Sequence, residues 1–225
     1  MRIGNIACNP GTAGIMLDGM DSAETFWEKH YGTRGTWGGR PNPLLVETVD
    51  GAAPGRALDL GCGPGGDTMW LAEQGWHVTA VDVSGTAVAG VRARVEELGL
   101  GDRVTTERHD LAESFPAGTY DLISAQYFHT PLPLDRDRIL RTAAGALNPG
   151  GLLLVVDHGS TAPWSWAREP GAHFPAPGEV AAGLALDPAG WTVERADMPR
   201  REATGPGGQK ATVTDNVLLL RRTPE

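Results

Sequence analysis

Short apolar runs alternate along the chain with segments whose apolar residues recur at helical spacing. Five of these runs have the pattern of strands: 56–60, 77–83, 104–110, 120–128 and 151–158. One of the intervening segments, 84–99, begins at Ser84, a residue type suited to the N-cap of a helix. Strands that alternate with helices predict a parallel sheet covered by helices on both faces.

The regions before and after this alternation have other patterns. Helical spacing over 22–31 and 41–51 predicts helices that cover the sheet. A stretch rich in proline and tryptophan begins at Gly159, and we interpret it as an ordered lid. The runs 191–198 and 211–222, on either side of a glycine-rich turn, predict a terminal hairpin. The expected fold is α/β: a Rossmann-like, doubly wound sheet of seven mostly parallel strands with an antiparallel end.

Charge and composition narrow the class of partner. The 225 residues include 19 lysines and arginines against 28 aspartates and glutamates, a formal net charge of −9. An acidic chain disfavours the binding of nucleic acid. With two cysteines and no apolar run near the roughly 20 residues of a membrane span, we expect a cytoplasmic protein without a membrane partner.

The stretch ALDLGCGPGGD at 57–67 joins the first strand to the helix after it. Gly61, Gly63 and Gly66 give the spacing G-x-G-x-x-G, and Asp82 stands 21 positions after Gly61, at the end of the second strand. Glycines let the backbone turn sharply and approach a ligand, and an acid at that strand end can accept from both ribose hydroxyls. The sequence therefore predicts a nucleotide site.

Asp59, two residues before the first glycine of the loop, indicates which nucleotide binds. A carboxylate there would repel the pyrophosphate of a dinucleotide, whereas S-adenosylmethionine has no phosphate and carries an ammonium and a sulfonium. Asp110 follows the third strand and is placed to accept from the adenine amino group. Two alternatives remain: an NAD-type oxidoreductase, which Asp59 and the terminal hairpin disfavour, and a non-catalytic adenosyl-binding module.

The chain resembles the class I S-adenosylmethionine-dependent methyltransferases. The stretches ALDLGCGPGGD, VTAVDVS, RHDL, YDLISAQ and LNPGG follow one another in that family's order over 57–151, and the final hairpin is similar to its reversed last strand. FWEKHYG and WGGRPNPLL resemble the small bacterial tellurite-resistance and thiopurine methyltransferases, whose substrates include soft chalcogen nucleophiles. The resemblance implies an enzyme that methylates a small-molecule acceptor on sulfur, oxygen or nitrogen.

The resemblance also implies cofactor-binding residues at matching positions: the loop under the methionine part, the ribose and adenine contacts, and the end of the fourth strand. These residues are Asp59, Gly61, Cys62, Gly63, Gly65, Asp82, Val83, Asp110, Leu111 and Gln126. Trp37 and Arg40 precede the sheet and are candidates to cover the cofactor; Arg40 either pairs with the methionine carboxylate or forms a surface ion pair. Asp67 is expected either to cap the helix that follows the loop or to face the ammonium group of the cofactor.

His129 and His158 lie just beyond the fourth and fifth strands, where open α/β sheets bind their ligands. Each is either structural or a base or ligand for the methyl acceptor, and only an acceptor that carries a proton needs a base. His30, His77 and His109 lack the spacing of a metal site, so no metal is implied.

We expect a flexible leader over 1–20 and a single methyltransferase domain over 21–225. Within that domain, 21–50 form a helical cover, 55–158 the cofactor-binding core, and 159–225 the lid and the terminal hairpin.

Overall fold

The structure is a computed structural model that describes residues 22–32, 37–165, 173–205 and 207–224 of the chain. The leader expected over 1–20, and the part of the lid over 166–172, lie outside these residues. What was expected of those two segments therefore stays a prediction, as does the division into cover, core and lid.

Five parallel strands form the body of the sheet, in the spatial order β3-β2-β1-β4-β5. Their bounds are β1 Arg56–Leu60, β2 His77–Asp82, β3 Val104–Arg108, β4 Tyr120–Gln126 and β5 Leu147–His158. The order reverses between β1 and β4, and this switch is the place where open α/β sheets bind ligands. The parallel strands expected from the sequence are confirmed.

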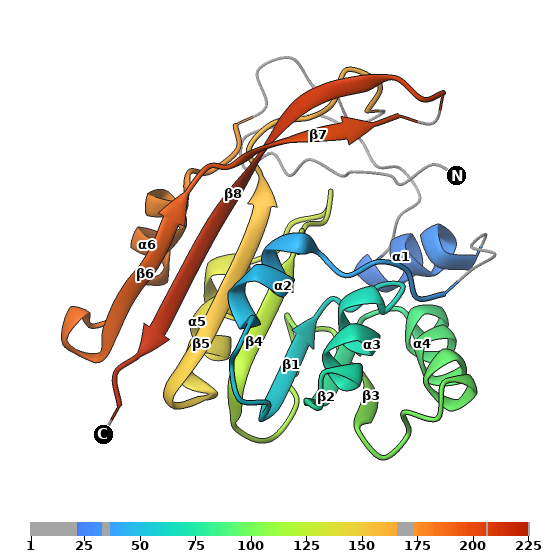
Figure 1. Ribbon diagram of the computed structural model, residues 1–225, viewed down its shortest axis with the longest axis horizontal. Helices are drawn as coiled ribbons and strands as arrows, with labels where there is room; N and C mark the ends of the chain where they lie inside the picture. The colour runs from blue at the N-terminus through green and yellow to red at the C-terminus, as the bar shows by residue number, and fades with distance from the viewer. Residues whose placement is uncertain (1–21, 33–36, 166–172, 206, 225) are drawn as a thin grey trace.

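Three further strands extend the sheet in antiparallel fashion. β8 (Lys210–Arg222) pairs with β5, and β6 (Trp191–Asp197) pairs with the other side of β8. A short β7 (Arg200–Thr204) pairs with the first residues of β8, and this hairpin extends past the ends of the parallel strands (Figure 1). The antiparallel end is confirmed, with eight strands in place of the seven expected, because the polar segment of β7 gave no strand pattern.

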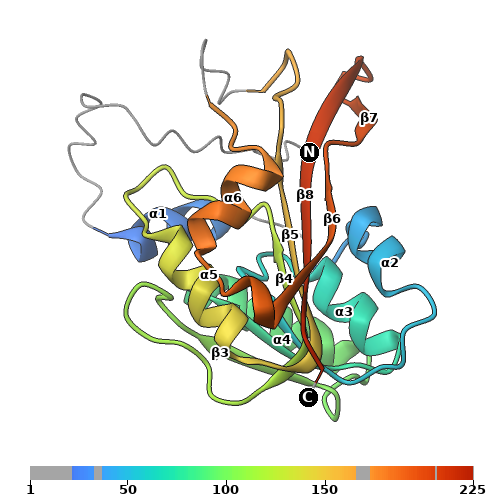
Figure 2. The same ribbon diagram turned by 90° about the vertical axis from the view of Figure 1, so that its left-hand side faces the viewer.

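Helices cover both faces of the sheet, as expected (Figure 2). Their bounds are α1 Ala23–Gly32, α2 Pro43–Val49, α3 Gly66–Glu73, α4 Gly85–Glu97, α5 Arg136–Gly145 and α6 Pro177–Leu184. Side chains of α2, α3 and α4 pack on one face, and those of α5 and α6 pack on the other. Ser84 caps α4 by accepting from the Ala87 amide at 3.1 Å, as the sequence predicts.

Each face has its own apolar core, because successive side chains of a strand point to opposite sides. Leu152, Leu154 and Val156 of β5 belong to one core, and Leu153 and Val155 belong to the other. His158 and Asp157 continue this alternation at the end of β5, so two polar side chains point to opposite faces beside the switch point. In the described part of the chain, every helix is too short or too polar to cross a membrane.

Candidate functional site

The loop between β1 and α3 has the backbone that its glycines predict. Gly61, Gly63 and Gly65 have φ values of 69°, 49° and 82°, which favour glycine. A Cβ on Gly61 would lie 3.0 Å from Cδ2 of Phe128, and one on Gly63 would lie 2.9 Å from the Tyr31 hydroxyl. The loop therefore needs glycine both for its conformation and for the close approach of two aromatic side chains.

Asp82 is held at the end of β2 by the same loop. Its carboxylate accepts from the Gly63 amide at 3.0 Å and from the Ser84 amide at 2.9 Å, and the residue is 6% exposed. Burial raises the pKa of Asp82 to about 6, although these hydrogen bonds oppose the rise. The carboxylate is thus fixed in position, with a charge that the protein itself compensates only in part.

Asp59 and Asp67 are two more buried acids around the loop. Asp59 accepts from the Thr68 hydroxyl at 2.6 Å, and Asp67 accepts from the Asn42 amide at 2.6 Å. Burial raises the pKa of both, and for Asp59 the nearby carboxyls add to the rise. Within the described residues the three acids Asp59, Asp67 and Asp82 meet hydrogen-bond donors and one another, but no basic side chain.

The capping role expected for Asp67 is wrong. Gly65, in the left-handed region, is the N-cap of α3, and Asp67 lies inside the first turn of that helix. Its carboxylate instead holds the segment that precedes α2, because it accepts from the Asn42 amide. Asn42 in turn caps α2 and donates through Nδ2 to Oε1 of Gln126 at 2.7 Å. The end of β4 is thereby tied to the segment that crosses the loop.

A cavity of about 90 Å³ lies at the carboxyl ends of β1 to β4. Five of the predicted cofactor residues line it: Gly61, Asp82, Val83, Asp110 and Leu111. Tyr31 of α1 and Phe128 after β4 also line it, and both lie against the glycine loop. Since ligand sites usually measure roughly 300–1,000 Å³, we expect these aromatic side chains to move when a ligand enters.

The other predicted cofactor residues lie around this cavity without lining it. Cys62 is buried in the loop, its amide donating to the Val81 carbonyl at 2.9 Å, and burial raises the pKa of its thiol. The ring of Trp37 packs where a side chain on Gly90 of α4 would lie. Arg40 places its backbone carbonyl over Gly66 and leaves its side chain exposed. Gln126 points to Asn42 and Ser124.

The structure brings His129 and His158 together beside the cavity, between Tyr127 and Asp157. Their rings are 5.7 Å apart and nearly parallel, and His158 stacks on Tyr127 at 4.3 Å. Burial lowers the pKa of His129 to about 3 and that of His158 to about 4. Both imidazoles are therefore neutral at pH 7. Neither lines the cavity, but Phe128 and Thr130 on either side of His129 do.

Two ion pairs, each with a buried carboxylate, flank the histidines, and sequence reasoning missed both. Arg136 of α5 donates from one nitrogen to both oxygens of Asp157, at 2.6 and 2.8 Å. Arg201 of β7 donates to Asp215 at 2.6 Å, and the Tyr127 hydroxyl donates to the same carboxylate at 3.0 Å. The DH dipeptide at 157–158 was the one local signal, because a carboxylate beside a candidate base often positions it.

Glu28 helps to position the site, a role that the sequence did not indicate. Its carboxylate accepts from the Ser84 hydroxyl and from the Thr86 amide, each at 3.1 Å, and from the Thr86 hydroxyl. These bonds fix α1 on the N-terminus of α4, so that Tyr31 reaches the glycine loop.

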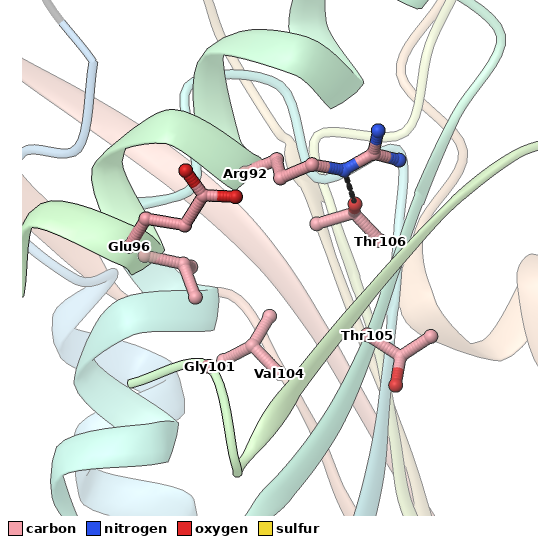
Figure 3. Close-up of a pocket in the computed structure, with 7 residues that line it drawn as sticks. Arg92, Glu96, Gly101, Val104, Thr105 and Thr106 are labelled. Atoms are coloured by element: carbon pink, nitrogen blue, oxygen red, sulfur yellow. Dashed lines mark hydrogen bonds between the residues drawn. The ribbon is translucent and has the colours of Figure 1, made fainter. Parts of the chain in front are cut away.

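A second cavity, of about 320 Å³, lies at the β3 edge of the sheet, away from the predicted site residues (Figure 3). It is lined by Arg92, Val95, Glu96, Gly101, Val104, Thr105 and Thr106. Arg92 crosses it to donate to the Thr106 hydroxyl at 3.1 Å. Among the described residues, no group of three or more histidines, cysteines or acids is arranged as a metal site.

Residues 57–151 match the family described as methyltransferase domains. Methyltransferase GfsG of Streptomyces halstedii is 36% identical over 53% of this chain and 44% of its own length. Probable thiol methyltransferase 2 of Arabidopsis thaliana is 32% identical over 58% of this chain and 60% of its own length. Ribosomal RNA small subunit methyltransferase C of Alcanivorax borkumensis is 32% identical over 50% of this chain and 36% of its own length. The chain thus spans about half the length of the curated relatives it matches.

The fold is shared over a longer stretch. A solved structure from work on the conversion of a disulfide bond into a thioacetal group during echinomycin biosynthesis has a TM-score of 0.68 and 26% identity. That match covers 89% of this chain and 93% of the other. TehB from Haemophilus influenzae has a TM-score of 0.65 and 22% identity over 89% of this chain and 67% of its own, which shows a common fold.

Proposed function

We propose that the chain is a class I S-adenosylmethionine-dependent methyltransferase, with S-adenosylmethionine as its cofactor, and that it methylates a small-molecule acceptor. The acceptor would lie at the carboxyl ends of β4 and β5, beside the cofactor cavity, where His129 and His158 meet. The class of acceptor, the base and the cofactor-binding residues are all part of this proposal.

The group of three buried acids around the glycine loop is the observation that carries the proposal. A buried carboxyl without a basic partner is costly, and the pKa of each is raised accordingly. A ligand with an ammonium and a sulfonium would supply the missing positive charge, while the pyrophosphate of NAD would add negative charge. The residues present therefore fit S-adenosylmethionine: Asp82 for the ribose hydroxyls, and Asp59 and Asp67 as a negative field behind the loop.

Support for a small acceptor comes from charge and from the names of relatives. A net charge of −9 opposes a nucleic-acid partner, although some relatives are named for ribosomal RNA. Another relative is named a thiol methyltransferase, and a third an L-tyrosine C(3)-methyltransferase. The narrower resemblance to tellurite-resistance and thiopurine methyltransferases rests on few residues and stays a prediction.

When bound, S-adenosylmethionine would supply an activated methyl group for transfer to the nucleophile. The chain has three tasks: to bind, to orient and to handle the proton of the nucleophile. Asp82 fixes the cofactor side of the cavity, and Tyr31 and Phe128 cover it and exclude water. His129 or His158 would accept the proton, since both are neutral.

Isothermal titration of the full chain with S-adenosylhomocysteine and with NAD tests the proposal. We expect S-adenosylhomocysteine to bind and NAD to give no response. Asp82→Ala should weaken S-adenosylhomocysteine by about 1.5–3 kcal/mol, the loss expected for hydrogen bonds to a charged group. Asp102→Ala, in the exposed turn before β3, is the matched control and should leave the affinity unchanged.

Tight NAD binding without a response to S-adenosylhomocysteine would favour the oxidoreductase alternative and end the proposal. Binding of S-adenosylhomocysteine without methylation of any acceptor tested would favour a non-catalytic adenosyl-binding module. If the Asp82→Ala variant keeps the wild-type affinity, only the role assigned to Asp82 is contradicted, and the rest of the proposal stands.

A further inference from the structure

The imidazole of His129 is buried without a hydrogen-bond partner in the described part of the chain. Its side chain is 9% exposed, and neither Nδ1 nor Nε2 is hydrogen-bonded. A buried imidazole that makes no hydrogen bond loses its hydration without compensation. At a ligand site, such an imidazole can form a hydrogen bond with a bound ligand, which supplies the missing partner.

The surroundings of the two nitrogens differ. Nε2 lies 3.4 Å from Oδ1 of Asp157, outside hydrogen-bond geometry but close enough for the carboxylate to act on it. Arg136 holds that carboxylate through both oxygens and also donates to the Phe128 carbonyl at 3.1 Å. Arg136 therefore fixes both the Asp157 carboxylate and the loop that carries His129.

An imidazole in contact with a carboxylate places its N–H toward the negative oxygens, because a bare lone pair there would be repelled. We propose that Asp157, held by Arg136, fixes His129 as the Nε2–H tautomer, so that Nδ1 is a hydrogen-bond acceptor for an uncharged X–H nucleophile. This rests on the proposed function and names the class of acceptor: a hydroxyl or an uncharged amine, in preference to a thiolate or another anion.

The charged groups around His129 agree with this assignment. Asp157 and His158 face it from β5, and Arg136 faces it from α5. Tyr127, Asp215 and Arg201 lie behind His158, and their ion pair is complete without His129. Burial and Arg136 keep the pKa of His129 low, so the ring stays neutral. A neutral ring with a bare Nδ1 repels an anion and accepts from an X–H group.

The proton balance follows from this placement. As the bond from the methyl carbon to X forms, the X–H proton passes to Nδ1 of His129, and X keeps the electron pair for the new bond. The imidazolium then loses its proton to water, which its low pKa favours. His129 is the catalytic residue in this scheme, whereas Arg136 and Asp157 are positioning residues.

The tautomer is measurable without turnover, by two-bond ¹H–¹⁵N correlation spectra of the full chain labelled in its six histidines. The His129 signals are identified by their loss in His129→Asn. We expect a single, neutral Nε2–H tautomer from pH 5 to 8. In the double variant Arg136→Gln/Asp157→Asn, where both charges are removed together, we expect a mixture of the two tautomers.

Observation of the Nδ1–H tautomer, or of an imidazolium at pH 7, would overturn the proposal. So would a double variant that folds, by circular dichroism, and keeps the wild-type tautomer populations. If the double variant does not fold, Asp157→Glu is the second variant: it keeps the charge but moves it, and should also disturb the tautomer.

The class of acceptor is tested with a panel in which phenols, alcohols and aromatic amines represent X–H groups, and iodide, benzoate and thiophenolate represent anions. We expect turnover of X–H acceptors only. Turnover of the anions by the wild-type chain, or turnover of the X–H acceptors at the wild-type rate in His129→Leu, would contradict the assignment. S-Adenosylhomocysteine binding, measured on the same samples, separates the two failures: without that binding the proposed function fails, whereas binding with the wrong tautomer overturns only this inference.

Discussion

Two groups of buried carboxylates lie at the carboxyl ends of the parallel strands, and they differ in whether a basic side chain pairs with them. Asp59, Asp67 and Asp82 surround the glycine loop without a basic partner among the described residues. At the end of β5 and at the positions opposite it in β8, Asp157 and Asp215 each have an arginine. The first group lacks a cation that a ligand can supply, whereas the second is complete and leaves a neutral imidazole beside it.

The difference shows what each side of the site has to do. A cationic cofactor gains most from carboxylates whose charge nothing else compensates. A methyl acceptor requires fixed geometry, and the Arg136–Asp157 ion pair, in which one guanidinium nitrogen donates to both carboxylate oxygens, provides that with little net charge. Changes on the cofactor side should therefore alter affinity, whereas changes beside His129 should alter turnover or folding.

The largest expected effect is on turnover. With an X–H acceptor, His129→Ala should lower kcat by about 10²–10⁴-fold, because the proton loses its acceptor in the transition state. The affinity for S-adenosylhomocysteine should stay unchanged, since His129 does not line the cofactor cavity. Steady-state kinetics combined with calorimetry measures both quantities.

His77→Ala is the matched control for this change. His77 is exposed at the beginning of β2, the opposite end of that strand from the glycine loop, and its loss should leave kcat as it is. His158→Ala should have a smaller effect than His129→Ala, because stacking on Tyr127 makes its main contact. If His129→Ala raises KM and leaves kcat intact, the acceptor is already ionised and needs no base.

The next effect is on folding. Arg136→Gln leaves Asp157 as an unpaired carboxylate that is 3% exposed, and it should lower the free energy of unfolding by about 3–5 kcal/mol. The double variant Arg136→Gln/Asp157→Asn removes both charges and should recover most of that loss. Urea unfolding measured at one pH gives all three values.

Arg138→Gln, on the same helix, is the control for this second change. Its ion pair with Asp135 is long, at 3.8 Å, and both side chains are more than half exposed, so we expect a loss below about 1 kcal/mol. Equal losses for Arg136→Gln and Arg138→Gln would mean that burial does not distinguish the two arginines, and the contrast between the two groups of charges would fail.

The sequence predicts one of these groups much better than the other. Asp59 and Asp82 stand at fixed distances from the glycines of one loop, so the local pattern is enough to place them. Arg136 and Asp157 are 21 residues apart, and they meet because α5 packs over β5 in the folded chain. No local pattern encodes that contact.

The same distinction holds for the fold. The apolar runs of β1, β2, β4 and β5 are visible in the sequence because most residues of these strands are buried. RREAT of β7 is polar, and it becomes a strand only because β8 offers it a partner. Asp67 misled the capping prediction since Gly65, in a left-handed conformation, ends the loop first.

The smallest expected effect is a dependence of stability on pH. Its sign is opposite for Asp82, in the first group, and for His129, the imidazole beside the second group. The folded-state pKa of Asp82, about 6, is above the unfolded value of about 3.9. Its contribution is therefore complete below pH 4 and is lost as the pH rises through 6, a change of at most about 3 kcal/mol. The folded-state pKa of His129, about 3, is below the unfolded value of about 6.5. Its contribution is present above pH 6.5 and is lost as the pH falls toward 3.

Two neutral replacements separate these contributions in the cofactor-free protein. Relative to wild type, Asp82→Asn should gain stability by about 2–3 kcal/mol as the pH rises from 4 to 7, because the variant has no buried carboxyl to ionise. Relative to wild type, His129→Asn should gain a similar amount as the pH falls from 7 to 4, because no buried imidazole resists protonation. Urea unfolding at pH 4, 5, 6 and 7 measures both differences. Saturating S-adenosylhomocysteine, whose ribose hydroxyls would donate to the Asp82 carboxylate and favour its charged form, should flatten the Asp82 difference and leave the His129 difference unchanged. If both variants respond to pH with the same sign, the two groups of charges do not differ in the way the structure indicates.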